Sequence, residues 1–364
     1  MIDRIKIALQ LSDQMPTLHK KKAESLQRLL VSWASFCSDL KFQSELAGKQ
    51  FLCALPLRYP EVGFATIYQK AAFDEPYEIL GVDGSQIYPD RHWGFDCFLI
   101  NVGALFVSYG VHASSAQFFN EPTVFKTSIL QDENIAKAVD CLRHEYEFLK
   151  ALELFQSFKS SENGCILFDG SLLFWHLQPY KNLKERFLKR YFELLLQLYH
   201  QQFLHAFYIS APQSKDLISI MRSYGQTNNQ AVDYEDLVDA DFLGEWLPVG
   251  ARTVVFQVPI NGTQDYPSVL VPCFFYLNSG HEVVRVEIPF WIASDQSLVS
   301  KVVSIIWDQV EKGRGYPLVL AEAHEQAVVK TEDRAYFYAA INQYSKDAHS
   351  GTSQKQRHKQ QMFY

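Results

Sequence analysis

The sequence lacks the cysteine spacing of a zinc ribbon or of a disulfide-stabilised fold. Its six cysteines are scattered along 364 residues, and no two of them form a C-x-x-C pair. They are Cys37, Cys53, Cys97, Cys141, Cys165 and Cys273. Most lie inside apolar runs, where a thiol acts as a small buried side chain. We therefore expect a soluble protein of the cytoplasm, a compartment that keeps thiols reduced.

Long apolar runs and nucleotide-binding loops are also missing. No uninterrupted stretch of 18 apolar residues occurs, and the opening residues MIDRIK do not begin an apolar signal segment. The sequence therefore predicts no membrane-spanning helix and no membrane partner. It contains no Walker-type loop and no G-x-G-x-x-G motif. The motifs of the P-loop and dinucleotide-binding sites are thus absent.

A net positive charge is absent as well. The formal charge of −7 argues against a protein that coats nucleic acid along its whole surface, although local basic surfaces remain compatible with it. Hydrophobic residues make up 48 % of the chain, which is enough for a large core and excludes disorder over most of it. The length suits one large domain with additions, or two domains.

The first 70 residues predict a helical arm. Their apolar residues recur at steps of three and four, with Lys20, Lys21 and Lys22 off this stripe. The stripe consists of Leu26, Leu29, Leu30, Trp33 and Phe36. Such a segment either packs on the core or binds a partner, and packing is the favoured prediction. We further predict one domain over residues 75–345 and a basic, disordered tail over 346–364.

One three-residue motif occurs twice, each time directly after an apolar strand. Residues 79–82 lead into Asp83-Gly84-Ser85, and residues 165–168 lead into Asp169-Gly170-Ser171. The strand holds the acid at a sheet edge, and the glycine allows a turn or the close approach of a ligand. A single Asp-Gly pair is most simply a turn. Two copies favour a site in which both carboxylates bind a hard divalent cation.

Residues 133–158 predict a helix that contributes a third carboxylate. Its apolar face includes Ala138, Leu142, Leu149 and Leu152. Glu145 is expected in the middle of this face, whereas Glu147 is expected on the opposite, wetter side. A carboxylate buried among leucines needs a cation, a hydrogen-bond partner or a proton. Glu145 therefore either pairs with a basic residue or faces a metal; we prefer the metal, with Glu147 as the alternative ligand.

A further helix, predicted over 181–205, carries the clearest basic cluster of the chain. Its members are Lys181, Lys184, Arg186, Lys189 and Arg190. The cluster is either a solvated helix face or a groove for a phosphate backbone, and both interpretations stay open. After a short strand over 206–210, Lys215 is placed where a lysine could point at a phosphate.

The remaining segments complete a mixed α/β pattern. Residues 96–109 predict one or two strands beside the first Asp strand, and 111–130 a less regular stretch. Residues 295–312 predict a helix, and Tyr316 opens a last helix that carries His324. A lone histidine on a helix is more often a packing or capping residue, so composition alone leaves His324 undecided.

Three acids from two strands and a helix, without a zinc-type set of Cys and His, suit Mn²⁺ or Mg²⁺. Two such ions about 3.5–4 Å apart activate a water molecule and stabilise the leaving oxygen of a phosphodiester. The sequence thus predicts that Asp83, Glu145 and Asp169 hold a pair of ions.

In their order and spacing, these elements resemble the NurA nucleases over roughly residues 75–340. The resemblance implies an α/β fold with a ribonuclease H-like mixed sheet flanked by helices and an N-terminal helical arm. It implies that Asp83 and Asp169 are metal ligands and that the helix glutamate is a third. Tyr316 and His324 match the late tyrosine and histidine of the family, and Lys215 matches a lysine that follows a strand.

The resemblance further implies a Mn²⁺-dependent deoxyribonuclease with 5′→3′ exonuclease and single-strand endonuclease activities. Members of the family process double-strand-break ends as dimers with the hexameric ATPase HerA. We therefore expect DNA, a HerA-type ATPase and a second copy of the chain as partners. His324 would contact the scissile phosphate, and Tyr316 would position the strand. The rival functions are a non-catalytic DNA-binding scaffold subunit of a motor complex and a metal-dependent phosphohydrolase acting on a small substrate.

Overall fold

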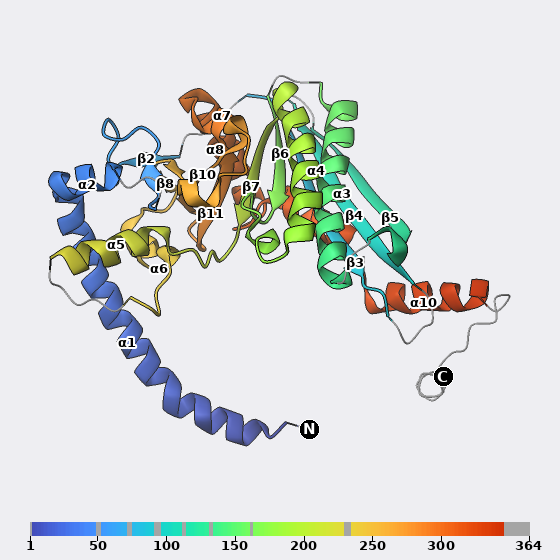
Figure 1. Ribbon diagram of the computed structural model, residues 1–364, viewed down its shortest axis with the longest axis horizontal. Helices are drawn as coiled ribbons and strands as arrows, with labels where there is room; N and C mark the ends of the chain where they lie inside the picture. The colour runs from blue at the N-terminus through green and yellow to red at the C-terminus, as the bar shows by residue number, and fades with distance from the viewer. Residues whose placement is uncertain are drawn as a thin grey trace. The chain divides into compact units, whose positions relative to one another are not determined.

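Figure 1 shows a computed structural model of the 364-residue chain. The structure describes residues 2–48, 52–70, 75–90, 96–110, 114–130, 134–160, 163–228 and 234–345. The tail predicted over 346–364 lies outside these residues. Among the helices of the described residues, none has both the length and the apolar character that a membrane crossing requires.

The chain divides into two compact units. Unit 1 comprises residues 1–72 and 207–307, and unit 2 comprises residues 73–206 and 308–364. Two elements cross the division: strand β7 (Leu204–Ile209) and helix α8 (Gln296–Lys312). The predicted arm over 1–70 and domain over 75–345 stay predictions.

Unit 2 is built on a meander of three antiparallel strands with helices between and after the strands. Its elements are β3 (Tyr77–Ile87), β4 (Cys97–Tyr109), β5 (Ser114–Lys126), α3 (Ile135–Phe158), β6 (Gly164–Asp169), α4 (Lys181–His200), α9 (Leu318–Ala327) and α10 (Thr331–Ser345), with short 3₁₀ turns η2 (Thr127–Ile129) and η3 (Trp175–Leu177). β3 pairs with β4 antiparallel and with β6 parallel. The apolar residues that precede each Asp-Gly-Ser motif are buried, as expected for central strands.

Unit 1 combines the N-terminal helix with short strands and a buried hairpin. Its elements are α1 (Arg4–Ser38), α2 (Leu40–Ala47), β1 (Leu55–Pro56), β2 (Ile67–Gln69), α5 (Asp216–Thr227), α6 (Asp239–Trp246), β8 (Ala251–Thr253), β9 (Phe256–Gln257), η4 (Ile260–Gly262), η5 (Ser268–Leu270), β10 (Pro272–Asn278), β11 (Val283–Pro289) and α7 (Phe290–Ala293). The described strands follow the order β1-β9-β10-β11-β7-β6-β3-β4-β5, while β8 pairs with β10 and β2 with β8. The predicted fold class, a mixed sheet flanked by helices with an N-terminal helix, is confirmed.

Helices α3 and α9 cover opposite faces of strand β3. A Cβ at Gly84 would meet Glu147 of α3 at 2.4 Å, whereas a Cβ at Gly81 would meet the backbone of Val319 in α9 at 2.4 Å. Successive strand residues alternate between the two faces, so these two glycines point in opposite directions. Each glycine lets one helix lie directly against the strand, and in Figure 1 α3 and α4 cross in front of β3 and β6.

The largest error in the strand prediction concerns β5. Residues 111–130 were predicted as less regular, but β5 pairs with β4 along its entire length, from Ser114 opposite Tyr109 to Lys126 opposite Cys97. Its side chains are mostly exposed, so this edge strand shows no apolar alternation. The predicted single last helix is in fact two helices, α9 and α10.

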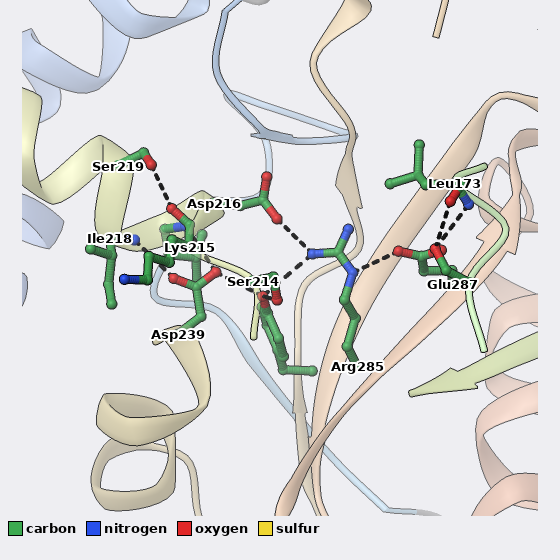
Figure 2. A network of polar contacts seen from close by, with 12 residues as sticks. Leu173, Ser214, Lys215, Asp216, Ile218, Ser219, Asp239, Arg285 and Glu287 are labelled. Atoms are coloured by element: carbon green, nitrogen blue, oxygen red, sulfur yellow. Dashed lines mark hydrogen bonds and ion pairs between the residues drawn. The ribbon is translucent and has the colours of Figure 1, made fainter. Parts of the chain in front are cut away.

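A buried ion-pair network lies within unit 1 (Figure 2). Arg285 Nη1 is 2.6 Å from Asp216 Oδ2, and its Nε is 2.7 Å from Glu287 Oε1. Asp239 is fully buried and accepts a 2.9 Å hydrogen bond from the N–H of Ile218 at the start of α5. Burial, followed by the charge of Asp216, raises the pKa of Asp239 to about 7. The network joins the N-termini of α5 and α6 to strand β11.

Candidate functional site

Both acids of the repeated motif lie where the parallel pairing of β3 with β6 ends. Asp169 is the last residue of β6, whereas Asp83 lies inside β3, which continues beside β4 to Ile87. In the parallel register of β3 and β6, Gly81 is opposite Leu167 and Val82 is opposite Phe168. Asp83 and Asp169 are the next residues of the two strands. In-register residues of neighbouring strands point to the same face, so the two carboxylates lie side by side at the end of this pairing. The register therefore places the two copies of the motif next to each other, which agrees with the prediction that they form one site.

Helix α9 places His324 against the first of these carboxylates. His324 Nδ1 lies 2.7 Å from Asp83 Oδ2, and the His324 side chain is 57 % exposed. The position of the helix follows from a glycine on β4, because a Cβ at Gly103 would lie 2.2 Å from the backbone nitrogen of Ala327. Asn101 then donates a 2.7 Å hydrogen bond to the carbonyl of Ala327, one of the last carbonyls of α9. The histidine that composition left undecided thus contacts the acid.

Tyr316 belongs to the same site through the second carboxylate. It lies in the turn between α8 and α9, and its side chain is hydrogen-bonded to Asp169. Burial, and then the negative charge of Asp83, raises the pKa of Asp169, while the bond from Tyr316 opposes this shift. Two carboxylates close enough to influence each other in this way attract a cation.

Glu147 is the third carboxylate of the site. It is 7 % exposed, and burial, together with the charges of Asp83 and Asp169, raises its pKa to about 8. Gly84 makes its position available, because the carboxylate lies where a Cβ of that residue would be. Arg143 is placed one helical turn before Glu147, with its Nε 3.4 Å from Glu147 Oε1 and its Nη1 donating a 3.0 Å hydrogen bond to the Gly84 carbonyl.

The prediction that Glu147 lies on the wet side of its helix was wrong, because Glu147 is buried; which of Glu145 and Glu147 is the metal ligand stays a prediction. Glu145 Oε2 pairs with Arg190 Nη1 of α4 at 3.0 Å, which is the basic-residue pairing that the sequence analysis held as the alternative. Burial raises the pKa of Glu145, and Arg190 counters that shift. The error lay in the helix face: the buried stripe of α3 is centred on Phe148 and Ala151 rather than on the half-buried Leu149. A stripe turned by one residue brings Glu147 inward.

The chemistry of these groups fits a hard divalent cation. Glu147 Oε1 is buried and has no hydrogen-bond partner among the described residues, and the charges of Asp83 and Asp169 act on this carboxyl. Buried carboxylates in such surroundings bind a proton or a cation. Within the described residues, no three His, Cys, Asp or Glu side chains already lie close enough together to hold one ion. Binding of a cation would therefore draw the carboxylates closer together.

The predicted DNA-binding residues lie apart from this cluster in their contacts. On α4, Lys181 pairs with Glu185, Lys184 with Gln178, Lys189 with Glu193 and Arg190 with Glu145, and Arg186 donates to the carbonyls of Ile129 and Leu130. Lys215 belongs to unit 1, where its Nζ donates to the carbonyl of Glu235, and Figure 2 labels it beside Asp239. The role of all six in DNA binding stays a prediction.

Arg143 is the site residue that sequence reasoning missed. A signal for it was present, because an arginine four residues before a glutamate forms a pair on one helix face. The signal was passed over because Glu147 was expected on the wet side of the helix, where such a pair would be a solvated surface contact.

The fold and the site define the class of this protein: a mixed α/β protein with a carboxylate cluster where the parallel pairing of two central strands ends. A family model described as the NurA domain matches residues 77–329, which is more than half of the chain. The chain therefore belongs to the NurA family, as the resemblance indicated.

Solved structures are similar to the chain at low sequence identity. "Crystal structure of NurA" has 12 % identity and a TM-score of 0.39, and the match covers 75 % of this chain and 90 % of that one. "Crystal structure of NurA bound to dAMP and manganese" has 12 % identity and a TM-score of 0.39, over 88 % and 97 % of the two chains. "Crystal structure of NurA with manganese" has 12 % identity and a TM-score of 0.38, over 76 % and 91 %. A search of the curated proteins found no match.

Proposed function

We propose that this protein is a metal-dependent DNA nuclease. The observation that carries the proposal is the buried carboxylate of Glu147, which feels the charges of Asp83 and Asp169 and has one oxygen without a hydrogen bond from the described part of the chain. Membership of the NurA family supports the same activity. Arg143, with its Nε 3.4 Å from Glu147 Oε1, offsets only part of the cost of burying a third carboxylate beside two others, because the pKa of Glu147 still rises to about 8.

The metal is Mn²⁺, with Mg²⁺ as the alternative, and two ions are expected. Asp83, Glu147 and Asp169 would hold them, since carboxylate oxygens are the ligands that these cations prefer. Manganese is named in the titles of two of the similar NurA structures, where it belongs to those proteins. When bound, such ions lower the pKa of a water molecule and neutralise the charge on the departing oxygen.

The remaining side chains of the site orient the substrate and move a proton. His324 is fixed through Nδ1 by Asp83, so its second ring nitrogen is available to a scissile phosphate or to a water molecule. Tyr316, held by Asp169, would position the strand by stacking or by a hydrogen bond to phosphate. Both roles require access to the substrate, and His324 is exposed while Tyr316 is partly buried.

The biological setting of the proposal follows the resemblance to NurA. We propose 5′→3′ exonuclease and single-strand endonuclease activities on DNA ends, with a HerA-type hexameric ATPase as partner and a homodimer as the working state. The basic residues of α4 and Lys215 would contact the phosphate backbone, which makes binding sensitive to salt.

Cleavage of end-labelled DNA tests the proposal. The purified protein is incubated with single- and double-stranded DNA in Mn²⁺, Mg²⁺ or EDTA, beside Asp169→Asn and Glu145→Gln variants. Metal-dependent products that vanish in Asp169→Asn and persist in Glu145→Gln are expected. A folded protein that binds DNA without cutting it, alone and with the ATPase added, would identify a scaffold instead. Activity restricted to small phosphate esters would identify a phosphohydrolase.

A further inference from the structure

Polar side chains continue from the candidate site along one face of strand β3, within unit 2. Residues 84, 86 and 88 point to the same face, because side chains alternate along a strand. Gly84 lies against Glu147 of α3, and Gln86 Nε2 donates a 3.3 Å hydrogen bond to Asp140 Oδ1 of the same helix. The hydroxyl of Tyr88, directly after the strand, also donates to Asp140. This row of contacts therefore leads away from the carboxylates, between the end of β3 and the first turns of α3.

The ring of Tyr88 is exposed and held in place at the same time. The residue is 37 % exposed, and its hydroxyl is bound by Asp140, which Lys137 Nζ contacts in turn at 3.3 Å. Burial, followed by the hydrogen bond to Asp140, raises the pKa of Tyr88, so the hydroxyl stays protonated and remains a donor. An aromatic ring that is already held in place loses little conformational entropy when a flat ligand stacks on it. Tyr88 therefore has the properties of a stacking surface.

A second exposed aromatic residue, Trp175, belongs to the same part of unit 2. It opens the turn η3 and is 53 % exposed. The ring of the next residue, His176, lies 5.2 Å from the ring of His144 in α3. Burial lowers the pKa of His176 most, and the charges of Lys137 and Asp140 also act on it. The turn that carries Trp175 therefore lies beside the ion pair that holds the hydroxyl of the tyrosine.

We propose that Tyr88 and Trp175 stack on unpaired bases of a single DNA strand whose scissile phosphate lies at the carboxylates, while Lys137 contacts the phosphate backbone of that strand. Aromatic side chains beside a basic residue suit single-strand binding, because every base has a flat face and every nucleotide carries a negative charge. The side chain of Lys137 is 45 % exposed, so its ammonium group reaches solvent although it pairs with Asp140. The inference rests on the proposed nuclease function and names the substrate that the site would prefer, a strand with unpaired bases.

Distances along the two elements give the length of strand that reaches this surface. Tyr88 follows Asp83 by five residues, which is about 17 Å at about 3.4 Å per strand residue. Lys137 precedes Glu147 by ten residues, which is about 15 Å at about 1.5 Å per helical residue. Stacked nucleotides of one DNA strand rise about 3.4 Å each, so the surface lies about four or five nucleotides from the carboxylates. A dinucleotide at the cleavage position would be too short to reach it.

Fluorescence anisotropy of a labelled, single-stranded thymidine oligonucleotide longer than this distance tests the proposal. The full-length protein is titrated in EDTA, where metal-dependent cleavage does not occur. Tyr88→Ala and Trp175→Ala are each expected to weaken binding about tenfold, the loss of one stacked base. Tyr88→Phe keeps the ring and should bind more tightly than Tyr88→Ala. The matched control is Phe118→Ala, because Phe118 is 54 % exposed and lines up in the sheet with Gly81, on the face that α9 covers.

Two further probes separate stacking on bases from contact with the backbone. A strand of the same length whose sugars carry no bases should bind to the wild type and to Tyr88→Ala equally, because no base is left to stack. Lys137→Gln should lower the slope of binding against salt by about one, whereas Tyr88→Ala should leave this slope unchanged. The loss in Tyr88→Ala should also be smaller for a thymidine dinucleotide than for the long strand. Circular dichroism verifies that each variant keeps its fold.

Three results would overturn the proposal. Wild-type affinity in Tyr88→Ala and Trp175→Ala would show that neither ring contacts a base. An equal loss in Phe118→Ala, or an equal loss on the strand without bases, would exclude stacking at this place as the cause. In both cases a wild type that cleaves DNA with Mn²⁺ keeps the proposed nuclease function intact. A wild type that neither binds nor cleaves DNA would overturn the nuclease function and this inference together.

Discussion

Replacement of Glu147 by Gln distinguishes the contribution of this carboxylate to metal binding from its effect on the free energy of unfolding. Burial and two neighbouring carboxylates raise the pKa of Glu147 from 4.5 to about 8. The stability contribution of a carboxyl raised in this way is fully present below pH 4.5 and is lost as the pH rises towards 8. At pH 7 the unfolded chain has released this proton and the folded protein keeps it. Over about 2.5 pH units, at 1.36 kcal/mol each, the cost is about 3 kcal/mol.

The Glu147→Gln variant is therefore expected to be more stable than the wild type in EDTA at pH 7, by up to about 3 kcal/mol. For a chain of this length, that corresponds to a rise of about 4 °C in melting temperature. With Mn²⁺ the order reverses, because a ligand at about a thousand times its Kd adds about 4.1 kcal/mol to the wild type alone. Melting curves with EDTA and with Mn²⁺, from pH 5 to 8, measure both effects.

The matched control is Glu145→Gln on the same helix. Glu145 pairs with the half-exposed Arg190, so its replacement should change the melting temperature little and leave the response to Mn²⁺ intact. The reasoning is refuted if Glu147→Gln melts lower than the wild type in EDTA and still responds to Mn²⁺. Loss of the Mn²⁺ response in Glu145→Gln instead would restore Glu145 as the ligand.

Three further changes test other parts of the structure. Gly84→Ala places a Cβ 2.4 Å from Glu147 Oε1, so Mn²⁺ affinity measured by calorimetry should fall at least about tenfold. Asp239→Asn removes a carboxyl whose pKa is about 7 in the folded protein, so the decline in stability from pH 4 to 7 should flatten in denaturant titrations. Lys189→Glu on the exposed face of α4 should weaken DNA binding and lower its salt slope by about one.

Each of these changes has its own contradicting result. A Cβ at Gly244 meets no atom within 4 Å, so Gly244→Ala should bind Mn²⁺ normally, and equal losses in both glycine variants would reject the steric argument. An unchanged pH profile in Asp239→Asn would show that other groups set it. If Lys189→Glu binds DNA as well as the wild type, or if the exposed Lys41→Glu loses as much DNA affinity, then α4 does not contribute to a groove for the phosphate backbone.

Much of the candidate site was predictable because it lies in local sequence patterns. The motif Asp-Gly-Ser after an apolar run pointed to Asp83 and Asp169, whereas Tyr316 and His324 were singled out only by the resemblance to the NurA nucleases. Strand and helix periods also gave the mixed α/β class. Such features depend on a residue and its near neighbours, which the sequence states directly.

The contacts between distant segments were not predictable in the same way. The choice between Glu145 and Glu147 depended on a rotation of α3 by a single residue. The packing of Phe148 against Phe168, whose ring centroids lie 5.2 Å apart, decides that rotation. The edge strand β5 is visible only through its pairing with β4, since its own side chains are exposed.

The sequence by itself therefore determined which chemical groups this protein offers: two acids that follow apolar strand residues, a helix acid, and a late tyrosine and histidine. Only the tertiary structure decided which of these groups meet. Asp83 meets His324 because Gly81 and Gly103 admit α9 to the sheet, and Glu147 reaches the site because Gly84 leaves room for it. The physical reason is that burial and charge act through space, so a carboxylate acquires its pKa and its partners only when the chain has folded around it.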